Sequence, residues 1–262
     1  MVNGEPTFNK YKTKVDDSID IEYEDKTLTD IKPQEIPLDI VYEDEDLIVI
    51  NKPKHMVVHP APGNPDGTVV NALLHHCKEL SDVNGYFRPG IVHRIDKDTS
   101  GLLVCCKNNF AHNALSVQLQ DKTCYRKYYA LVDGIIANNE GEINAPIGRS
   151  SRDRQKMGVT DKNSKAAITD FKVLQRLSNS TLVDCELKTG RTHQIRVHMA
   201  FINHPVSNDP KYSKRIIDDE GQCLHAYYLS FIHPRSNQRM EFKTDMPIYM
   251  KEFINNNGGT IK

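Results

Sequence analysis

Short apolar segments with the alternation of β-strands outnumber helical segments in this chain, and the two kinds do not follow one another regularly. A doubly wound fold needs a regular alternation, so the pattern favours an α+β fold with a mixed, mainly antiparallel sheet. Helices are predicted over residues 68–77, with Thr68 as the cap, and over residues 192–202. Strands are predicted at residues 40–42 and 47–50, which form a hairpin, and at residues 102–106, 128–132, 168–174 and 182–187.

The 262 residues suit one main domain with a small appendage. We expect residues 1–36 to form a short head with its linker, and residues 37–262 to form the main domain. The head alternates like two short strands around a turn, which is too little material for a core of its own. The linker is the polar stretch around residues 27–37.

The net charge of −1 hides a division along the chain. Residues 1–46 hold 5 Lys/Arg against 14 Asp/Glu, whereas the rest holds 29 against 21. The basic body is compatible with a phosphate-binding surface, and equally with an uneven but merely solvated surface.

The six cysteines form no C-x-x-C pair, which speaks against a zinc ribbon or a thioredoxin-like redox motif. They are typical of small buried hydrophobic residues in a reducing compartment. No apolar run is long enough to span a bilayer, and the first residues do not resemble a secretory signal. We therefore expect a cytoplasmic protein without a membrane partner.

The densest group of charged residues lies between residues 88 and 101. Asp96 and Asp98 stand among Arg88, Arg94 and Lys97, in a loop just before a predicted buried strand. Cations favour the ionised form of an aspartate, which keeps it competent as a nucleophile or base. The alternative is an ordinary turn in which these side chains bind nearby backbone.

A second group spans residues 187–199. Gly190 permits a tight turn, and the helix that follows places His193 and Arg196 on neighbouring positions of one face. An arginine from this helix could meet a carboxylate. The same pattern also fits a helix that binds phosphate, or one whose basic side chains face water.

Two adjacent tyrosines, Tyr128 and Tyr129, lie on a predicted strand and must point to opposite faces. At least one could stack on a nucleic-acid base. The alternative is that both pack in a core with their hydroxyls hydrogen-bonded.

These groups and several shorter motifs occur in the same order as in RluA/RluD-type pseudouridine synthases, and the chain resembles that family. The resemblance covers residues 40–247. Its motifs are Asn51-Lys52-Pro53 with Val57-Val58-His59-Pro60, His93-Arg94-Ile95-Asp96 through Ser100-Gly101, Tyr128-Tyr129-Ala130, Thr189-Gly190-Arg191-Thr192-His193-Gln194-Ile195-Arg196, and Asp209-Pro210-Lys211-Tyr212 with Leu224-His225-Ala226.

The resemblance implies the pseudouridine synthase fold, with helices and loops around a central cleft, and a catalytic site within it. Asp96 matches the family's essential aspartate, Tyr128 the tyrosine that stacks on the target uracil, and Arg196 the arginine that pairs with the aspartate. Arg94 matches an arginine that helps to displace the flipped base. Further substrate contacts are expected at His93, Thr99, Arg191, His193 and Gln194.

The implied reaction is an isomerisation of uridine, in which Asp96 attacks the sugar or base or abstracts the C2′ proton. We expect no cofactor and no metal, because neither redox change nor hydrolysis takes place. Large-subunit ribosomal RNA is the expected substrate, with transfer RNA as the alternative, and a monomer is expected. The head resembles the closing strands of an S4 RNA-binding domain without its helices.

The chain departs from the family's pattern at two positions. Ile95 replaces a leucine, which is a conservative apolar exchange. Asn208 replaces a glycine, and asparagine tolerates a left-handed backbone better than most residues. A turn with positive φ is therefore still expected at Asn208.

Two other functions have to be weighed. A non-catalytic RNA-binding module would need the basic body but not Asp96. A metal-dependent hydrolase is disfavoured, because the neighbouring arginines and lysines would repel a divalent cation and no H-E-x-x-H spacing occurs. Its candidate ligands would be His93, His193, His198 and Asp209.

Overall fold

The computed structural model describes residues 1–8, 10–21, 31–85, 87–150, 153 and 156–260, and it divides the chain into two compact units, residues 1–30 and 31–262. In the first unit, Val2 forms single bridges with Glu5 and Ile19. Its described residues contain no strand, so the two predicted head strands are wrong. Hydrogen bonds such as that from Asn3 to Asp17 hold these loops instead. Residues 27–30 of the predicted linker lie outside the described residues.

The second unit begins at Ile31, earlier than the predicted boundary after residue 36. Ile31 is buried in the main core. The side-chain amide of Asn71 donates a hydrogen bond to the carbonyl of Lys32, and the backbone N–H of Gln34 donates to the carbonyl of Asn71. Residues 31–36 therefore pack on the body rather than on the head.

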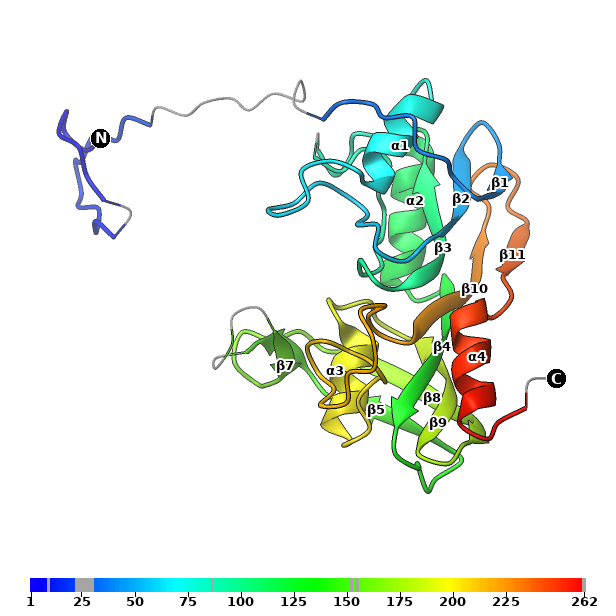
Figure 1. Cartoon of the computed structure of the whole chain (residues 1–262). Coiled ribbons are helices and arrows are strands. Elements are labelled where there is room, and N and C mark those ends of the chain that lie inside the picture. Colours follow the sequence, from blue (N-terminus) through cyan, green and yellow to red (C-terminus); the bar gives the residue numbers. More distant parts are fainter. Residues whose placement is uncertain (9, 22–30, 86, 151–152, 154–155, 261–262) are drawn as a thin grey trace. The chain divides into compact units, whose positions relative to one another are not determined.

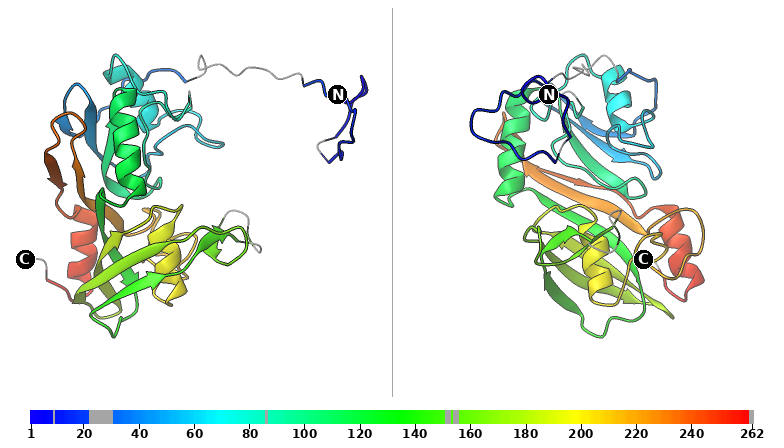
Figure 2. Two further views of the ribbon diagram at one scale, coloured as in Figure 1. Left: turned by 180° about the vertical axis from the view of Figure 1, so that it is seen from behind. Right: turned by 90° about the vertical axis from the view of Figure 1, so that its left-hand side faces the viewer.

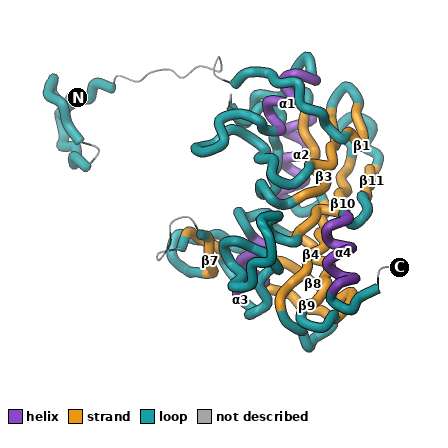
Figure 3. The backbone as a smooth tube through the Cα atoms, in the orientation of Figure 1, coloured by secondary structure: helices purple, strands orange, loops and turns teal. Residues whose placement is uncertain are grey.

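A nine-stranded sheet runs through the second unit in the order β1-β2-β3-β10-β4-β9-β8-β5, with β11 paired to β10 (Figures 1 and 3). Among the described strands, only the β3–β10 pair is parallel. The predicted mixed, mainly antiparallel α+β fold is confirmed. The strands are β1 Ile40–Glu43, β2 Leu47–Lys52, β3 Ser100–Cys106, β4 Tyr125–Asp133, β5 Glu140–Asn144, β8 Ile168–Arg176, β9 Ser180–Leu187, β10 Leu224–Ile232 and β11 Arg239–Lys243, with a separate hairpin of β6 Ile147–Arg149 and β7 Met157–Val159.

Helices cover both faces of the sheet. Successive side chains of a strand point to opposite faces, so neighbouring residues of one strand pack against different helices. Ile48 and Ile50 of β2 share a cluster with α1 (Val69–His76) and α3 (Gln194–Phe201). Leu47 and Val49, their neighbours in the sequence, share another cluster with α2 (Asn109–Gln120). Leu131 of β4, also on that second face, packs with α4 (Ile248–Asn256). Figure 2 gives two further views of these helices. None of the described helices is long and apolar enough to cross a membrane.

The two predicted helices begin differently. Thr68 caps α1 as expected, since its side chain accepts a hydrogen bond from the backbone N–H of Asn71. The second helix starts at Gln194 rather than at Thr192, because His193 lies before it in a left-handed conformation with φ 57°. His193 and Arg196 therefore do not share a helical face.

The start of β3 is pressed against β10. A Cβ at Gly101, which has φ +113°, would lie 2.3 Å from the carbonyl oxygen of Ala226. Only glycine fits such a close approach of two backbones. This contact holds the loop that precedes β3, residues 93–99, against the centre of the sheet.

Candidate active site

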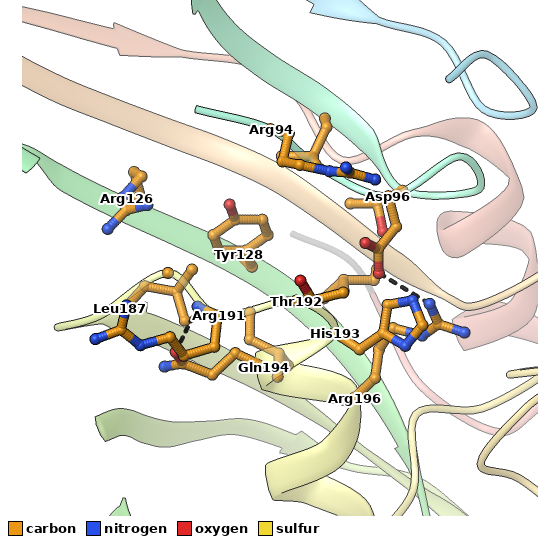
Figure 4. Close-up of a pocket in the computed structure, with 15 residues that line it drawn as sticks. Arg94, Asp96, Arg126, Tyr128, Leu187, Arg191, Thr192, His193, Gln194 and Arg196 are labelled. Atoms are coloured by element: carbon orange, nitrogen blue, oxygen red, sulfur yellow. Dashed lines mark hydrogen bonds and ion pairs between the residues drawn. The ribbon is translucent and has the colours of Figure 1, made fainter. Parts of the chain in front are cut away.

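A small pocket of about 110 Å³ opens where the loop before β3 faces the start of α3 (Figure 4). Its apolar wall comes from Leu187 at the end of β9, Leu224 at the start of β10, and Ile195. Polar side chains from three separate parts of the chain complete it. They are Arg94, Asp96, Thr99, Arg126, Tyr128, Arg191, Thr192, His193, Gln194 and Arg196.

The carboxylate of Asp96 lies in this pocket and receives a hydrogen bond from Nη1 of Arg196 at 2.8 Å. The side chain of Asp96 is 18% exposed, so it is accessible from the pocket. Burial raises the pKa of Asp96, but His193 in its protonated form and the permanent cations Arg196 and Arg94 outweigh burial and leave the pKa below its ordinary value. Asp96 is therefore ionised at neutral pH, and the predicted pairing with Arg196 is confirmed.

Arg196 is itself fixed by a second carboxylate. Its Nε and Nη2 donate to the two oxygens of Asp209, at 2.7 and 2.8 Å, and Asp209 is fully buried. A bidentate pair of this kind fixes the plane of the guanidinium. In the sequence, Asp209 belongs to a family motif and to the candidate ligands of the disfavoured metal site, and neither predicts this role. No signal in the sequence marks this role, because the fold decides which carboxylate meets a buried arginine.

Tyr128 points from β4 into the pocket (Figure 4). Tyr129 packs on the opposite face of the sheet, as the alternation predicted. The Tyr128 side chain is buried, and its hydroxyl has no hydrogen-bond partner among the described residues. Burial raises the pKa of Tyr128 to about 12, so the phenol is neutral. Tyr129 instead stacks on Tyr227 with the ring centroids 3.8 Å apart.

His193 and Thr99 both line the pocket. Nδ1 of His193 lies 2.9 Å from the hydroxyl of Tyr212, and burial lowers the pKa of His193 below its ordinary value. The ring is therefore neutral at neutral pH, and the permanent cation beside Asp96 is Arg196. The hydroxyl of Thr99 accepts a hydrogen bond from Gln222, and its backbone N–H donates to the Asp96 carbonyl.

Gln194 and Arg191 differ in how far they are free to contact a substrate. The side-chain oxygen of Gln194 accepts from Thr189 and from the Arg191 backbone, and its nitrogen donates to Ile168 and Thr169. Gln194 thus ties the start of α3 to β8. Arg191 is exposed and uses Nε to bind the carbonyl of Ala166. Substrate contacts by either residue stay predictions.

His93 and Arg94 point in different directions from the same loop. Nε2 of His93 accepts a hydrogen bond from the backbone N–H of Val104, and His93 lines a neighbouring groove rather than the pocket of Asp96. Arg94 lines both cavities, with Nη1 3.3 Å from Nε2 of His59. Of these two, only Arg94 lies at the predicted site beside Asp96.

The ligands proposed for a metal-dependent hydrolase do not come together. Asp209 is occupied by Arg196, and both ring nitrogens of His198 are hydrogen-bonded, to Thr169 and to the carbonyl of Ala145. Within the described residues, the metal-compatible group is a different one, made of Asp44, Asp46 and His233. The geometry therefore contradicts a metal centre built from His93, His193, His198 and Asp209.

A family model and two curated relatives match most of this chain. The sequence model described as RNA pseudouridylate synthase matches residues 46–201. The uncharacterized RNA pseudouridine synthase YlyB of Bacillus subtilis is 51% identical over 257 residues, which is 98% of this chain and 84% of that protein. Ribosomal large subunit pseudouridine synthase D of Zymomonas mobilis is 49% identical over 227 residues, 82% of this chain and 71% of that one.

A solved structure agrees with these relatives. Human RNA pseudouridylate synthase domain containing 1 has a TM-score of 0.65 and 27% identity, and the match covers 80% of this chain and 83% of that one. The matched family segment contains Asp96, Tyr128 and Arg196, the three residues that meet in the pocket. The chain therefore belongs to the RNA pseudouridylate synthase family and is an enzyme that isomerises uridine in RNA to pseudouridine.

Proposed function

We propose that this enzyme modifies uridines of large-subunit ribosomal RNA and that Asp96 is its catalytic carboxylate. Relatives named ribosomal large subunit pseudouridine synthase D, such as that of Zymomonas mobilis, support the choice of RNA. The observation that carries the catalytic role is the ionised Asp96, held by Arg196 beside the ring of Tyr128.

The reaction requires an ionised carboxylate whichever way Asp96 acts. The bond between N1 and C1′ breaks, the base turns, and a bond between C5 and C1′ forms, while C5 loses a proton and N1 gains one. The oxygen of Asp96 either attacks as a nucleophile or abstracts the C2′ proton. Arg196 holds the carboxylate of Asp96 in place and favours its ionised form before the reaction begins.

The pocket has room for a base that has left its stack. Its walls are Tyr128 and the apolar side chains of Leu187 and Leu224. Swinging a uridine out of a helix costs about a few kcal/mol, which stacking on an aromatic ring offsets. Arg94 lies at the rim, between the pocket and the neighbouring groove, where it can fill the space that the base leaves.

Mapping pseudouridines in cellular RNA, with and without the gene for this chain, tests the choice of RNA. The proposal expects one or more positions of large-subunit ribosomal RNA to lose the modification and to regain it when the gene is restored. Purified enzyme should modify the same positions in unmodified transcripts. Losses confined to transfer RNA would contradict the proposed substrate while leaving the chemistry of Asp96 intact.

A further inference from the structure

A groove of about 600 Å³ adjoins the pocket of Asp96, and the two share the side chains of Arg94, Arg126 and Arg191 together with Gly190. We propose that this groove binds a phosphodiester next to the target uridine, and that Arg126 is the main cation that holds this phosphodiester. The inference rests on the proposed function. None of the described residues that line the groove is acidic. Its cations are Arg88, Arg94, Lys122, Arg126, Lys188 and Arg191.

Arg126 is buried, with only 7% of its surface exposed, yet its guanidinium has no hydrogen bond or ion pair to any described residue. Its Nε is enclosed without a partner. Burying an unpaired charge costs several kcal/mol, so arginines in such places normally have a carboxylate beside them. Arg196, which is also buried, has two carboxylates beside it, those of Asp96 and Asp209. Arg126 therefore has a charge that no described side chain neutralises, and an anion that enters the groove can pair with it.

The turn before α3 passes close to the guanidinium of Arg126. A Cβ at residue 190 would lie 2.6 Å from Nη1 of Arg126, closer than real Cβ atoms come to their neighbours. A side chain at residue 190 would therefore push the end of Arg126 from its present place, and Gly190 leaves that place open. In Figure 4, Tyr128 lies between Arg126 and Asp96, so an anion on Arg126 would flank a base stacked on Tyr128.

The charge of the groove is permanent. Burial, with the cations Arg94 and Arg88, lowers the pKa of His59 to about 4. Burial, with Arg126, lowers the pKa of His93 to about 3. Both histidines are neutral at neutral pH, so the charge comes from arginines and lysines. Of these, Lys188 is paired with Glu186.

A phosphodiester suits these observations because it is a permanent anion with several acceptor oxygens, and RNA carries one beside every base. Arginine binds phosphate through two parallel N–H donors, and two Nη atoms of Arg126 are available for this. Each phosphate neutralised by a cation releases bound counterions, so the contact should be visible as a salt dependence of binding.

The test measures binding of an oligouridylate of about 12 nucleotides over a range of salt concentrations. Replacing Arg126 with Gln should lower the slope of log K against log salt by about 0.7 and weaken binding by about tenfold. Arg126→Lys should keep the slope, because the charge stays. Arg239→Gln serves as the matched control, because Arg239 lies over the Tyr125 ring, outside the groove, and should bind as the unchanged protein does. An Arg126→Gln variant with an unchanged slope would overturn the proposal.

Gly190→Ala provides a second test that leaves every charge in place. Its methyl group would push the end of Arg126 from its present place, so binding should weaken by no more than in Arg126→Gln, and the change should add nothing once Arg126 is Gln. Fully additive losses would also overturn the proposal. Wild-type enzyme that makes no pseudouridine in large-subunit ribosomal RNA would instead refute the proposed function, which the binding of oligouridylate does not measure.

Discussion

Arg196 joins two carboxylates that stand far apart in the sequence, with Nη1 on Asp96 and with Nε and Nη2 on Asp209. The buried Asp209 receives two of these hydrogen bonds, and the accessible Asp96 receives one. Because the bidentate pair fixes the guanidinium, the single bond to Asp96 has a defined direction. Asp209 is thus a positioning residue that acts on Asp96 through Arg196.

Asp209→Asn should weaken both folding and catalysis. The exchange keeps the shape but removes the charge, and breaking a buried ion pair costs about 3–5 kcal/mol in the free energy of unfolding. A displaced Arg196 should also lower kcat by about 10²-fold, since small errors of position at a reacting group are costly. Urea unfolding and single-turnover pseudouridine formation measure the two effects.

Asp170→Asn is the matched control for this prediction. Asp170 is 40% exposed, and its pair with Lys188 at 3.4 Å is open to solvent. Exposed pairs contribute about 0–1 kcal/mol, so the free energy of unfolding should hardly change. Wild-type stability and kcat in Asp209→Asn would show that Arg196 needs no second carboxylate.

Acid should destabilise the protein through His93. Its Nε2 accepts the Val104 N–H, and burial lowers its pKa to about 3, whereas an unfolded chain binds the proton near the ordinary value of 6.5. The unfolded state therefore takes up more protons as the pH falls, and stability is lost from about pH 6.5 downward. Between about pH 7 and 5 the expected loss from His93 is about 2 kcal/mol.

The variant His93→Gln tests this, because glutamine offers an acceptor to Val104 without titrating. Urea unfolding at both pH values should show a fall in stability that is smaller by about 2 kcal/mol than in the wild type. An equal fall in the two proteins would mean that His93 is not held neutral.

Much of the fold could be predicted from local patterns. The hairpin of β1 and β2, the cap at Thr68 and the strands β3, β4, β8 and β9 all follow from residues close in the sequence. Asn208 has φ 59°, as its exchange for glycine indicated. The helix α2 was not predicted, because its polar residues weaken the apolar stripe, and neither was β10, whose partners β3 and β4 are distant in the sequence.

The sequence identified the residues of the site, but it did not show which other residues hold them in place. The sequence placed Asp96, Tyr128 and Arg196 in one site through family motifs, and the structure brings them to one pocket. It could not show that Asp209 anchors Arg196, because charge pairing between distant segments depends on the fold. The close approach of Gly190 to Arg126 was not predictable either, because Arg126 lies on β4, far from Gly190 in the sequence.

The ring of Tyr128 should matter for RNA binding more than its hydroxyl does. Base stacking on an aromatic side chain is worth about 1–3 kcal/mol, so Tyr128→Ala should weaken RNA binding about 5- to 150-fold. Tyr128→Phe keeps the ring and loses only a hydroxyl that has no partner among the described residues, so its affinity should match the wild type. Equilibrium binding of an oligouridylate measures both, and an equal loss in the two variants would argue against stacking.

The most direct measurement is pseudouridine formation by Asp96→Asn, with Asp98→Asn as its control. Asparagine keeps the shape but cannot act as nucleophile or base, so the rate should fall at least about 10³-fold while RNA affinity changes little. Asp98 lies two residues away, outside the pocket and beside His55, and its variant should stay active. Wild-type rates in Asp96→Asn would contradict the assignment of the catalytic carboxylate.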